Sequence, residues 1–211
     1  SFRKHSNEQF EKYIDNAIAT TNIDGTIDDF KLRYLDVRWS NICNFKCRSC
    51  GPLYSSSWAQ EHGSEKIFTY AGGVNNDELY KQFEPHFDTI EEFYFAGGEP
   101  LLTDKHYDIL EYLIENGRTD VKLRYNTNMS VLKYKNKNVL DMWKKFSNVY
   151  IGASLDSWGP RAEYIRHGTI WNVIEQNIRT VREQAPHIHM QTNTVVSILN
   201  IKTLTEFIDY M

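Results

Sequence analysis

Short segments of β-strand character alternate with longer helical segments along most of the chain, and this order constrains the fold more than any other feature. The hydrophobic pattern predicts strands at residues 32–39, 90–96, 121–127, 149–155 and 188–196. It predicts helices at residues 7–19, 77–87, 103–115, 138–146 and 169–183, with a last helix beginning at Asn200. Because strand–helix alternation favours parallel strands joined by helical crossovers, we expect an α/β fold.

Composition and charge exclude several classes of protein. With 41% hydrophobic and 25% charged residues, the 211-residue chain is neither disordered nor fibrous. A formal net charge of −4 argues against a nucleic-acid partner, since binding to a nucleic-acid backbone usually shows as a basic surplus. The sequence has neither a transmembrane-length apolar run nor an apolar leader, so we expect no membrane association and a cytoplasmic location. The chain ends at Met211 within a predicted helix, which suggests a piece of a longer protein.

All three cysteines lie in one short loop after the first predicted strand, at Cys43, Cys47 and Cys50. An odd number of cysteines so closely grouped is a poor disulfide framework and indicates metal or redox chemistry. Three thiolates can hold three irons of a four-iron cluster, and the chain has no fourth cysteine for the remaining iron. An open iron site of this kind can bind a cofactor or substrate. The alternative is a zinc site completed by His62, although no second Cys or His pair is visible.

Polar motifs follow the other predicted strands at their carboxyl ends, where ligands bind in α/β folds. The second strand leads into Gly97-Gly98-Glu99-Pro100, whose glycines allow the backbone to approach a ligand closely. The third strand ends in a segment containing Asn126. Purely structural alternatives are a tight strand-to-helix turn for the glycines and an asparagine-rich turn for the second motif.

The last two predicted strands carry further polar candidates. Ser154 and Asp156 have the same parity along the fourth strand, so both side chains are expected on one face. Asn193 is the polar candidate on the fifth strand, where it shares a face with Gln191. We therefore expect one polar site along the carboxyl edge of the sheet.

The C-x₃-C-x₂-C loop together with Gly-Gly-Glu-Pro resembles the radical S-adenosylmethionine superfamily, over about residues 32–210. The resemblance implies a partial (β/α)₆ TIM-like barrel, truncated after about five βα units. Residues 1–31 would form an N-terminal helical extension, and residues 32–211 would form the core domain. Cys43, Cys47 and Cys50 would hold a [4Fe–4S] cluster, with S-adenosylmethionine on its open iron. Ser49 stands where the family usually has an aromatic residue.

The resemblance also implies a set of cofactor contacts. Gly97, Gly98 and Glu99 would receive the amino group of S-adenosylmethionine, while Ser154 and Asp156 would reach its ribose and methionine. Arg166 would pair with the methionine carboxylate. Arg161 is a competitor for this role, and a surface ion pair is the structural alternative for both arginines. Asn126 and Asn193 would complete the predicted cofactor-binding set.

The function implied by the resemblance is radical chemistry. One electron from a reducing donor would cleave S-adenosylmethionine to a 5′-deoxyadenosyl radical, which abstracts a hydrogen atom from the substrate. The motif layout is most similar to the branch with C-terminal SPASM or twitch domains, which implies a peptide or protein substrate. Two alternatives are a radical enzyme acting on a nucleoside, sugar or other small metabolite, and a non-catalytic zinc or iron–sulfur module.

Overall fold

The computed structural model describes residues 4, 8, 10–63 and 76–211. The chain divides into two compact units, Ser1–Leu32 and Arg33–Met211. The first unit contains helix α2 (Glu11–Thr20). The helix predicted at residues 7–19 is therefore present from Glu11 onward, and its expected start lies partly outside the described residues.

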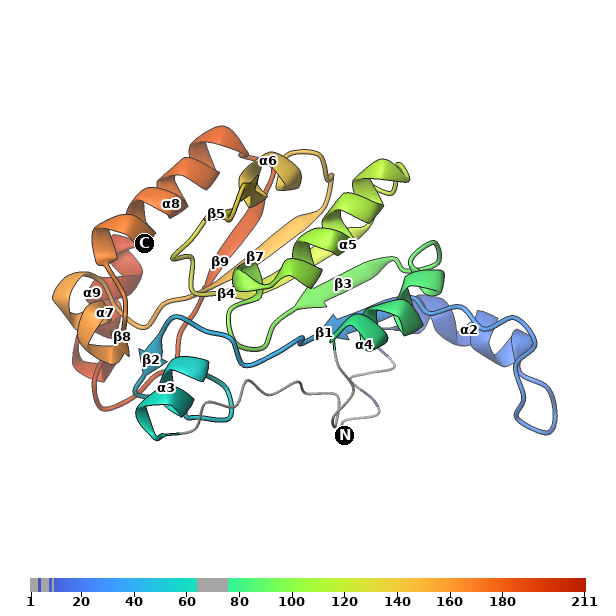
Figure 1. Cartoon of the computed structure of the whole chain (residues 1–211), viewed down its shortest axis with the longest axis horizontal. Helices are drawn as coiled ribbons and strands as arrows, with labels where there is room; N and C mark the ends of the chain where they lie inside the picture. The colour runs from blue at the N-terminus through green and yellow to red at the C-terminus, as the bar shows by residue number, and fades with distance from the viewer. Residues whose placement is uncertain (1–3, 5–7, 9, 64–75) are drawn as a thin grey trace. The chain divides into compact units, whose positions relative to one another are not determined.

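The second unit is built on a five-stranded sheet in which neighbouring strands are parallel (Figure 1). Its strands, in spatial order, are β1 (Tyr34–Val37), β3 (Glu92–Phe95), β4 (Lys122–Thr127), β7 (Val149–Ser154) and β9 (His189–Asn193). Each strand lies within a predicted range. The spatial order follows the chain order, as in a (β/α) barrel opened along one side. The predicted α/β class with a parallel sheet is confirmed.

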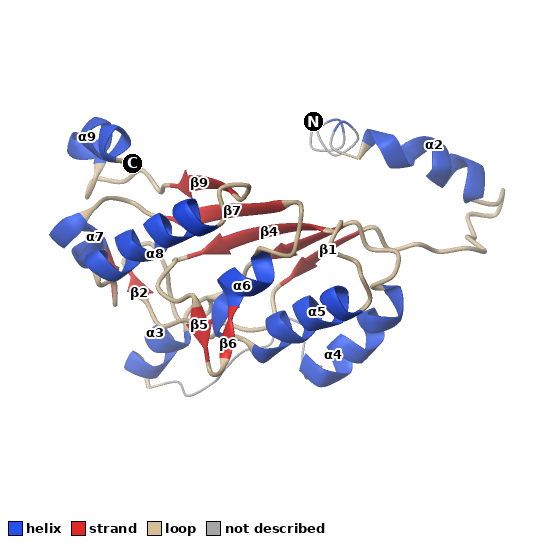
Figure 2. Ribbon diagram, turned by 90° about the horizontal axis from the view of Figure 1, so that it is seen from above, coloured by secondary structure: helices blue, strands red, loops and turns tan. Residues whose placement is uncertain are grey.

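Helices cover one side of this sheet (Figure 2). The helices that lie there are α4 (Asn76–Phe83), α5 (Asp104–Glu115), α6 (Val139–Trp143) and α8 (Trp171–Gln184). The helix predicted to continue to residue 87 ends at Phe83 and gives way to a 3₁₀ turn, Glu84–His86, because Pro85 cannot donate a backbone hydrogen bond. No helix among the described residues combines the length and apolar character needed to cross a membrane.

Several short elements escaped sequence-based prediction. They are the helices α3 (Ser56–Glu61) and α7 (Gly159–Ile165), and two antiparallel ladders, β2 (Lys46–Cys47) with β8 (Arg166–His167) and β5 (Lys133–Tyr134) with β6 (Lys137–Asn138). The predicted final helix is present as a 3₁₀ turn, Ile201–Thr203, followed by α9 (Leu204–Tyr210). Elements of two to seven residues are too short to show a hydrophobic period.

The two faces of the sheet differ in polarity. Side chains such as Phe93, Phe95 and Leu123 are fully buried on the helix-covered face. Alternate residues on the opposite face line a cavity of about 510 Å³, and they include Tyr94, Lys122, Arg124, Asn126, Tyr150 and Asn193. The core therefore lies between sheet and helices, while the other face is polar and open to a ligand.

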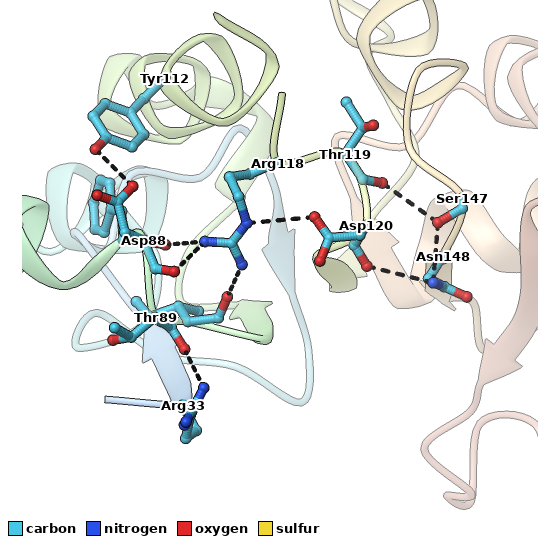
Figure 3. Close-up of polar contacts among 11 residues, drawn as sticks. Arg33, Asp88, Thr89, Tyr112, Arg118, Thr119, Asp120, Ser147 and Asn148 are labelled. Carbon is cyan, nitrogen blue, oxygen red and sulfur yellow. Dashed lines mark hydrogen bonds and ion pairs between the residues drawn. The ribbon is translucent and has the colours of Figure 1, made fainter. Parts of the chain in front are cut away.

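One arginine ties together the loops at the amino ends of the strands (Figure 3). The Arg118 guanidinium donates to the carbonyls of Phe87 (3.1 Å), Asp88 and Ile90 (2.9 Å). The Asp88 carboxylate in turn accepts from the Tyr112 hydroxyl at 3.2 Å. Because these contacts lie opposite the carboxyl edge, they stabilise the fold rather than form the site.

Candidate cofactor site

Hydrogen bonds to its backbone carbonyls hold the cysteine loop in place, and all three of its cysteines are free. Ser57 Oγ donates to the carbonyl of Cys43 at 2.7 Å, and Trp58 Nε1 donates to that of Cys47 at 2.9 Å. Ser55 caps helix α3 and donates to the Phe45 carbonyl at 2.6 Å. Helix α3 therefore holds the loop in shape through side-chain donors.

The thiol set fits an iron–sulfur cluster better than a zinc ion. Within the part of the chain that the structure describes, no three His, Cys, Asp or Glu side chains converge on a single metal position. A zinc site requires such convergence, whereas a four-iron cluster takes each cysteine on a different iron. Burial raises the pKa of Cys43 to about 12 and also raises that of Cys47. A bound metal would deprotonate these thiols.

Arg166 lies against the cysteine loop. Arg166 and Cys47 are partners in the β2–β8 ladder, and Arg166 Nη1 lies 3.8 Å from Cys47 Sγ. The guanidinium also pairs with Asp156, with Nε to Oδ2 at 2.8 Å and Nη2 to Oδ1 at 3.0 Å. Asp156 Oδ1 accepts from the backbone of Val195 at 2.9 Å. The structure thus brings Arg166 and Asp156 together as a link from the loop to the segment after β9. Their contacts with a cofactor stay predictions.

The Gly-Gly-Glu-Pro segment packs directly on the backbone that leads into the cysteine loop. A Cβ atom at Gly98 would lie 2.2 Å from the carbonyl oxygen of Ile42, closer than real Cβ contacts. Gly97 has φ +109°, a conformation that favours glycine. The Gly98 amide donates to Ser40 at 3.1 Å, and the Glu99 amide donates to Ile42 at 2.6 Å. The two glycines therefore have a packing role besides any contact with a ligand.

The Glu99 carboxylate is buried among donors from the protein. It accepts from Thr127 Oγ1 (2.7 Å), the Asn128 amide (2.7 Å) and the Leu101 amide (3.2 Å). Burial raises the pKa of Glu99 to about 7, although these hydrogen bonds act in the opposite direction. Glu99 therefore joins the ends of β3 and β4.

Three predicted residues meet on the open face of the sheet. Asn193 Nδ2 donates to Asn126 Oδ1 at 2.8 Å, and Asn126 Nδ2 donates to the Tyr94 hydroxyl. Ser154 is the strand partner of Asn193. A Cβ atom at Gly152 would lie 2.2 Å from Asn193 Nδ2, so this glycine makes room for the amide bridge.

Sequence reasoning missed the residues that hold the site in place. Besides the donors from α3, Asn128 Nδ2 donates to Asn44 Oδ1 at 2.9 Å and joins the end of β4 to the cysteine loop. The serine run 55–57 shortly after Cys50 was the available signal, because serines near a helix start often bond to backbone. His62, the zinc alternative, is exposed, and its Nδ1 lies 3.0 Å from the Trp58 carbonyl.

The family model of the radical SAM superfamily matches residues 37–211. The chain therefore belongs to the radical S-adenosylmethionine superfamily. This superfamily uses a [4Fe–4S] cluster and S-adenosylmethionine. The predicted SPASM or twitch branch is not shown by this match.

Curated relatives include GTP 3′,8-cyclases. The protein of that name from Nautilia profundicola is 30% identical over 174 residues, which cover 81% of this chain and 50% of the relative. The one from Sulfurimonas denitrificans is 24% identical over 192 residues, covering 84% and 56%. The chain thus spans about half the length of these relatives.

Solved structures share the fold. Native anSMEcpe with bound AdoMet has a TM-score of 0.58 at 18% identity, over 84% of this chain and 49% of that one. Streptococcus suis SuiB bound to precursor peptide SuiA has a TM-score of 0.53 at 16% identity, over 95% and 40%. At these identities the likeness concerns the fold.

Proposed function

We propose that Cys43, Cys47 and Cys50 bind a [4Fe–4S] cluster, and that the enzyme abstracts a hydrogen atom from a substrate in the 510 Å³ cavity. When bound and reduced, the cluster and S-adenosylmethionine supply a 5′-deoxyadenosyl radical. The observation that carries the proposal is the loop of three free cysteines docked against Gly97 and Gly98 at the carboxyl edge of the sheet.

The protein's own residues position this chemistry. Helix α3 and Arg166 hold the loop, and Glu99 fixes the neighbouring strand ends. We keep the predicted cofactor-binding set as part of the proposal: Gly97, Gly98, Glu99, Asn126, Ser154, Asp156, Arg166 and Asn193. Of these, Asn126 and Asn193 line the cavity, which supports a location between cofactor and substrate.

A small anionic metabolite, such as a nucleoside phosphate, is the first candidate substrate. Two observations support it: the curated relatives are named for GTP, and the cavity carries Lys122 and Arg124 beside Tyr94 and Tyr150. Cationic groups bind phosphates, and aromatic rings pack against bases. The residues that line the cavity thus match both parts of a nucleotide.

A peptide or protein substrate is the second candidate, together with a C-terminal SPASM or twitch domain. It is supported by the motif layout from the cysteine loop to Asn193. For either substrate a reducing electron donor is required. Residues 1–31 would be an N-terminal extension of the core domain at residues 32–211.

Anaerobic cofactor cleavage tests the proposal. The chain is reconstituted with iron and sulfide, reduced with dithionite and mixed with S-adenosylmethionine, and 5′-deoxyadenosine is quantified. We expect product from the wild type and from the loop control Ser49→Ala, and none from Cys47→Ala. Product from Cys47→Ala at the wild-type level, or a wild type that takes up zinc and no four-iron cluster, would contradict it.

A further inference from the structure

The open face of the sheet carries an imbalance of charge at the start of β4. Glu92 Oε2 lies 3.1 Å from Lys122 Nζ, and Glu92 Oε1 lies 3.0 Å from Arg124 Nη1, so one carboxylate serves two cations. The neighbouring Arg38 is already paired with Asp36, with Nε to Oδ1 at 2.9 Å and Nη2 to Oδ2 at 3.0 Å. Among the residues that the structure describes, the cluster of Glu92, Lys122 and Arg124 therefore carries one more positive than negative charge.

The two cations are more accessible than the carboxylate between them. Their side chains are 38% (Lys122) and 39% (Arg124) exposed, whereas the Glu92 side chain is 19% exposed. Both cations line the 510 Å³ cavity. An anion entering the cavity therefore meets the cations first.

Aromatic rings hold the cations in place. Arg124 lies 5.2 Å from the ring centroid of Tyr94, and Lys122 Nζ lies 4.9 Å from that of Tyr150. The Tyr150 ring also packs on His189, with centroids 5.3 Å apart. Cations supported by aromatic faces lose less freedom when they bind an anion.

The distance from the two cations to the hydrogen-bonded side chains of Asn126 and Asn193 indicates the size of the ligand. Arg124 and Lys122 precede Asn126 by two and four residues on the same strand and share its face. At about 3.3 Å per residue, they lie roughly 7 and 13 Å from Asn126 along the strand. A ligand that reaches from the cations to Asn126 is about as long as a phosphorylated sugar or nucleoside.

We propose that Lys122 and Arg124 form a binding subsite for an oxyanion group, a phosphate or a carboxylate, of a small substrate whose other end lies at Asn126 and Asn193. This inference rests on the proposed function, because it names the part of the cavity that recognises the substrate. Glu92 positions both cations and competes with the bound anion.

Ligand binding tests the subsite separately from radical chemistry. Calorimetry on the full chain would use pyrophosphate, succinate and GTP as probes, at low and at physiological salt. We expect Arg124→Gln and Lys122→Gln each to weaken binding of the preferred probe about tenfold, as loss of a charge-assisted hydrogen bond does. The matched control Lys145→Gln removes an exposed charge elsewhere and should change the Kd less than twofold.

A variant that is expected to tighten binding separates an effect on the subsite from misfolding. Glu92→Gln removes the competing carboxylate and should tighten binding severalfold, whereas a misfolded protein would lose it. If the wild type binds pyrophosphate more tightly than succinate, the subsite is assigned to a phosphate group. If it binds succinate more tightly, the subsite is assigned to a carboxylate group. Unchanged affinity in Arg124→Gln, or no binding of any probe by the wild type, overturns the subsite.

Cofactor cleavage in the absence of substrate distinguishes the two proposals. If the wild type binds the anion but cleaves no cofactor, the proposed function fails and the subsite stands. If cleavage occurs but Arg124→Gln binds the probes like the wild type, the subsite alone fails.

Discussion

Arg166 and Cys47 face each other across the two-residue β2–β8 ladder, with Arg166 Nη1 3.8 Å from the Cys47 sulfur. The same guanidinium forms a two-point ion pair with the buried carboxylate of Asp156. One side chain therefore links the cysteine loop to the segment after β7. Its position makes Arg166 a positioning residue for the loop.

Replacing Arg166 should disturb both stability and the cluster environment. Arg166→Met leaves the Asp156 carboxylate buried without its cation, so we expect a loss of about 3–5 kcal/mol in the free energy of unfolding. Urea denaturation of cluster-free protein measures this loss. The electron paramagnetic resonance spectrum of the reduced, reconstituted protein should also change, a readout that global stability does not control.

The double variant Asp156→Asn with Arg166→Met is the control. Because it leaves no unpaired buried charge, it should recover part of the lost stability while the altered cluster spectrum persists. An ordinary surface substitution changes the free energy of unfolding by less than about 0.5 kcal/mol. A change this small in Arg166→Met would show that the link through Arg166 is unimportant.

Gly98→Ala should prevent the strand end from seating on the cysteine loop. The added methyl would lie 2.2 Å from the Ile42 carbonyl oxygen, and its nearest neighbours are all backbone atoms of Asn41 and Ile42, so no flexible side chain can move aside. We expect a loss of at least about 2 kcal/mol in unfolding free energy and reduced iron content after reconstitution.

Gly51→Ala provides the matched control for Gly98→Ala. Gly51 lies in the same loop region, but a Cβ atom there has nothing within 4 Å. This variant should keep wild-type stability and iron content. Equal effects of the two substitutions would indicate that added bulk near the cysteines, rather than the contact with Ile42, causes the loss.

The sequence was sufficient to predict the sheet and the positions of the motifs. Strands such as β4 and β7 combine a buried apolar face with turn residues at their ends, so their pattern is local. Each motif is likewise local, since Cys43, Cys47 and Cys50 lie in one short segment and Gly97 and Gly98 are neighbours. Their shared location follows from the rule that ligands bind at the carboxyl edge of parallel strands.

The partners of individual side chains could not be predicted. Arg166 and Cys47 are 119 residues apart, and Thr127 reaches Glu99 from the next strand. Such pairs depend on the register between distant segments, which no local pattern encodes. The cations on β4 were also missed, since polar residues alternating with Leu123 suggest a solvent-exposed face rather than the wall of a cavity.

Arg118→Lys should destabilise the fold without affecting the cofactor site. A lysine keeps the charge but lacks the planar fork that reaches the carbonyls of Phe87, Asp88 and Ile90. We expect a loss of about 1–3 kcal/mol in unfolding free energy, measured by urea denaturation. Arg179→Lys, at an exposed arginine paired with Glu175, should cost less than about 0.5 kcal/mol. Similar losses in the two variants would argue against a special role for Arg118.

His106 should make the fold sensitive to acid. Its ring is fully buried between Phe95 and Tyr107, with Nε2 2.9 Å from the Tyr125 hydroxyl. Burial, and to a lesser degree Lys137, lowers the pKa of His106 to about 3 from the ordinary 6.5. The unfolded chain therefore binds a proton below about pH 6.5 that the folded chain does not accept until about pH 3. The stabilising contribution is complete above pH 6.5 and is lost as the pH falls through this window.

His106→Leu removes this titration and replaces the imidazole with an apolar side chain of similar volume. Urea denaturation from about pH 7 to about pH 4 should show wild-type stability falling, relative to the variant, by up to about 1.4 kcal/mol per pH unit below about pH 6.5. Glu99, whose pKa burial raises to about 7, contributes an opposite slope between about pH 4.5 and 7. This slope is present in both proteins and cancels in the difference. A stability curve for His106→Leu that runs parallel to that of the wild type would mean that the buried ring accepts its proton without cost to the fold.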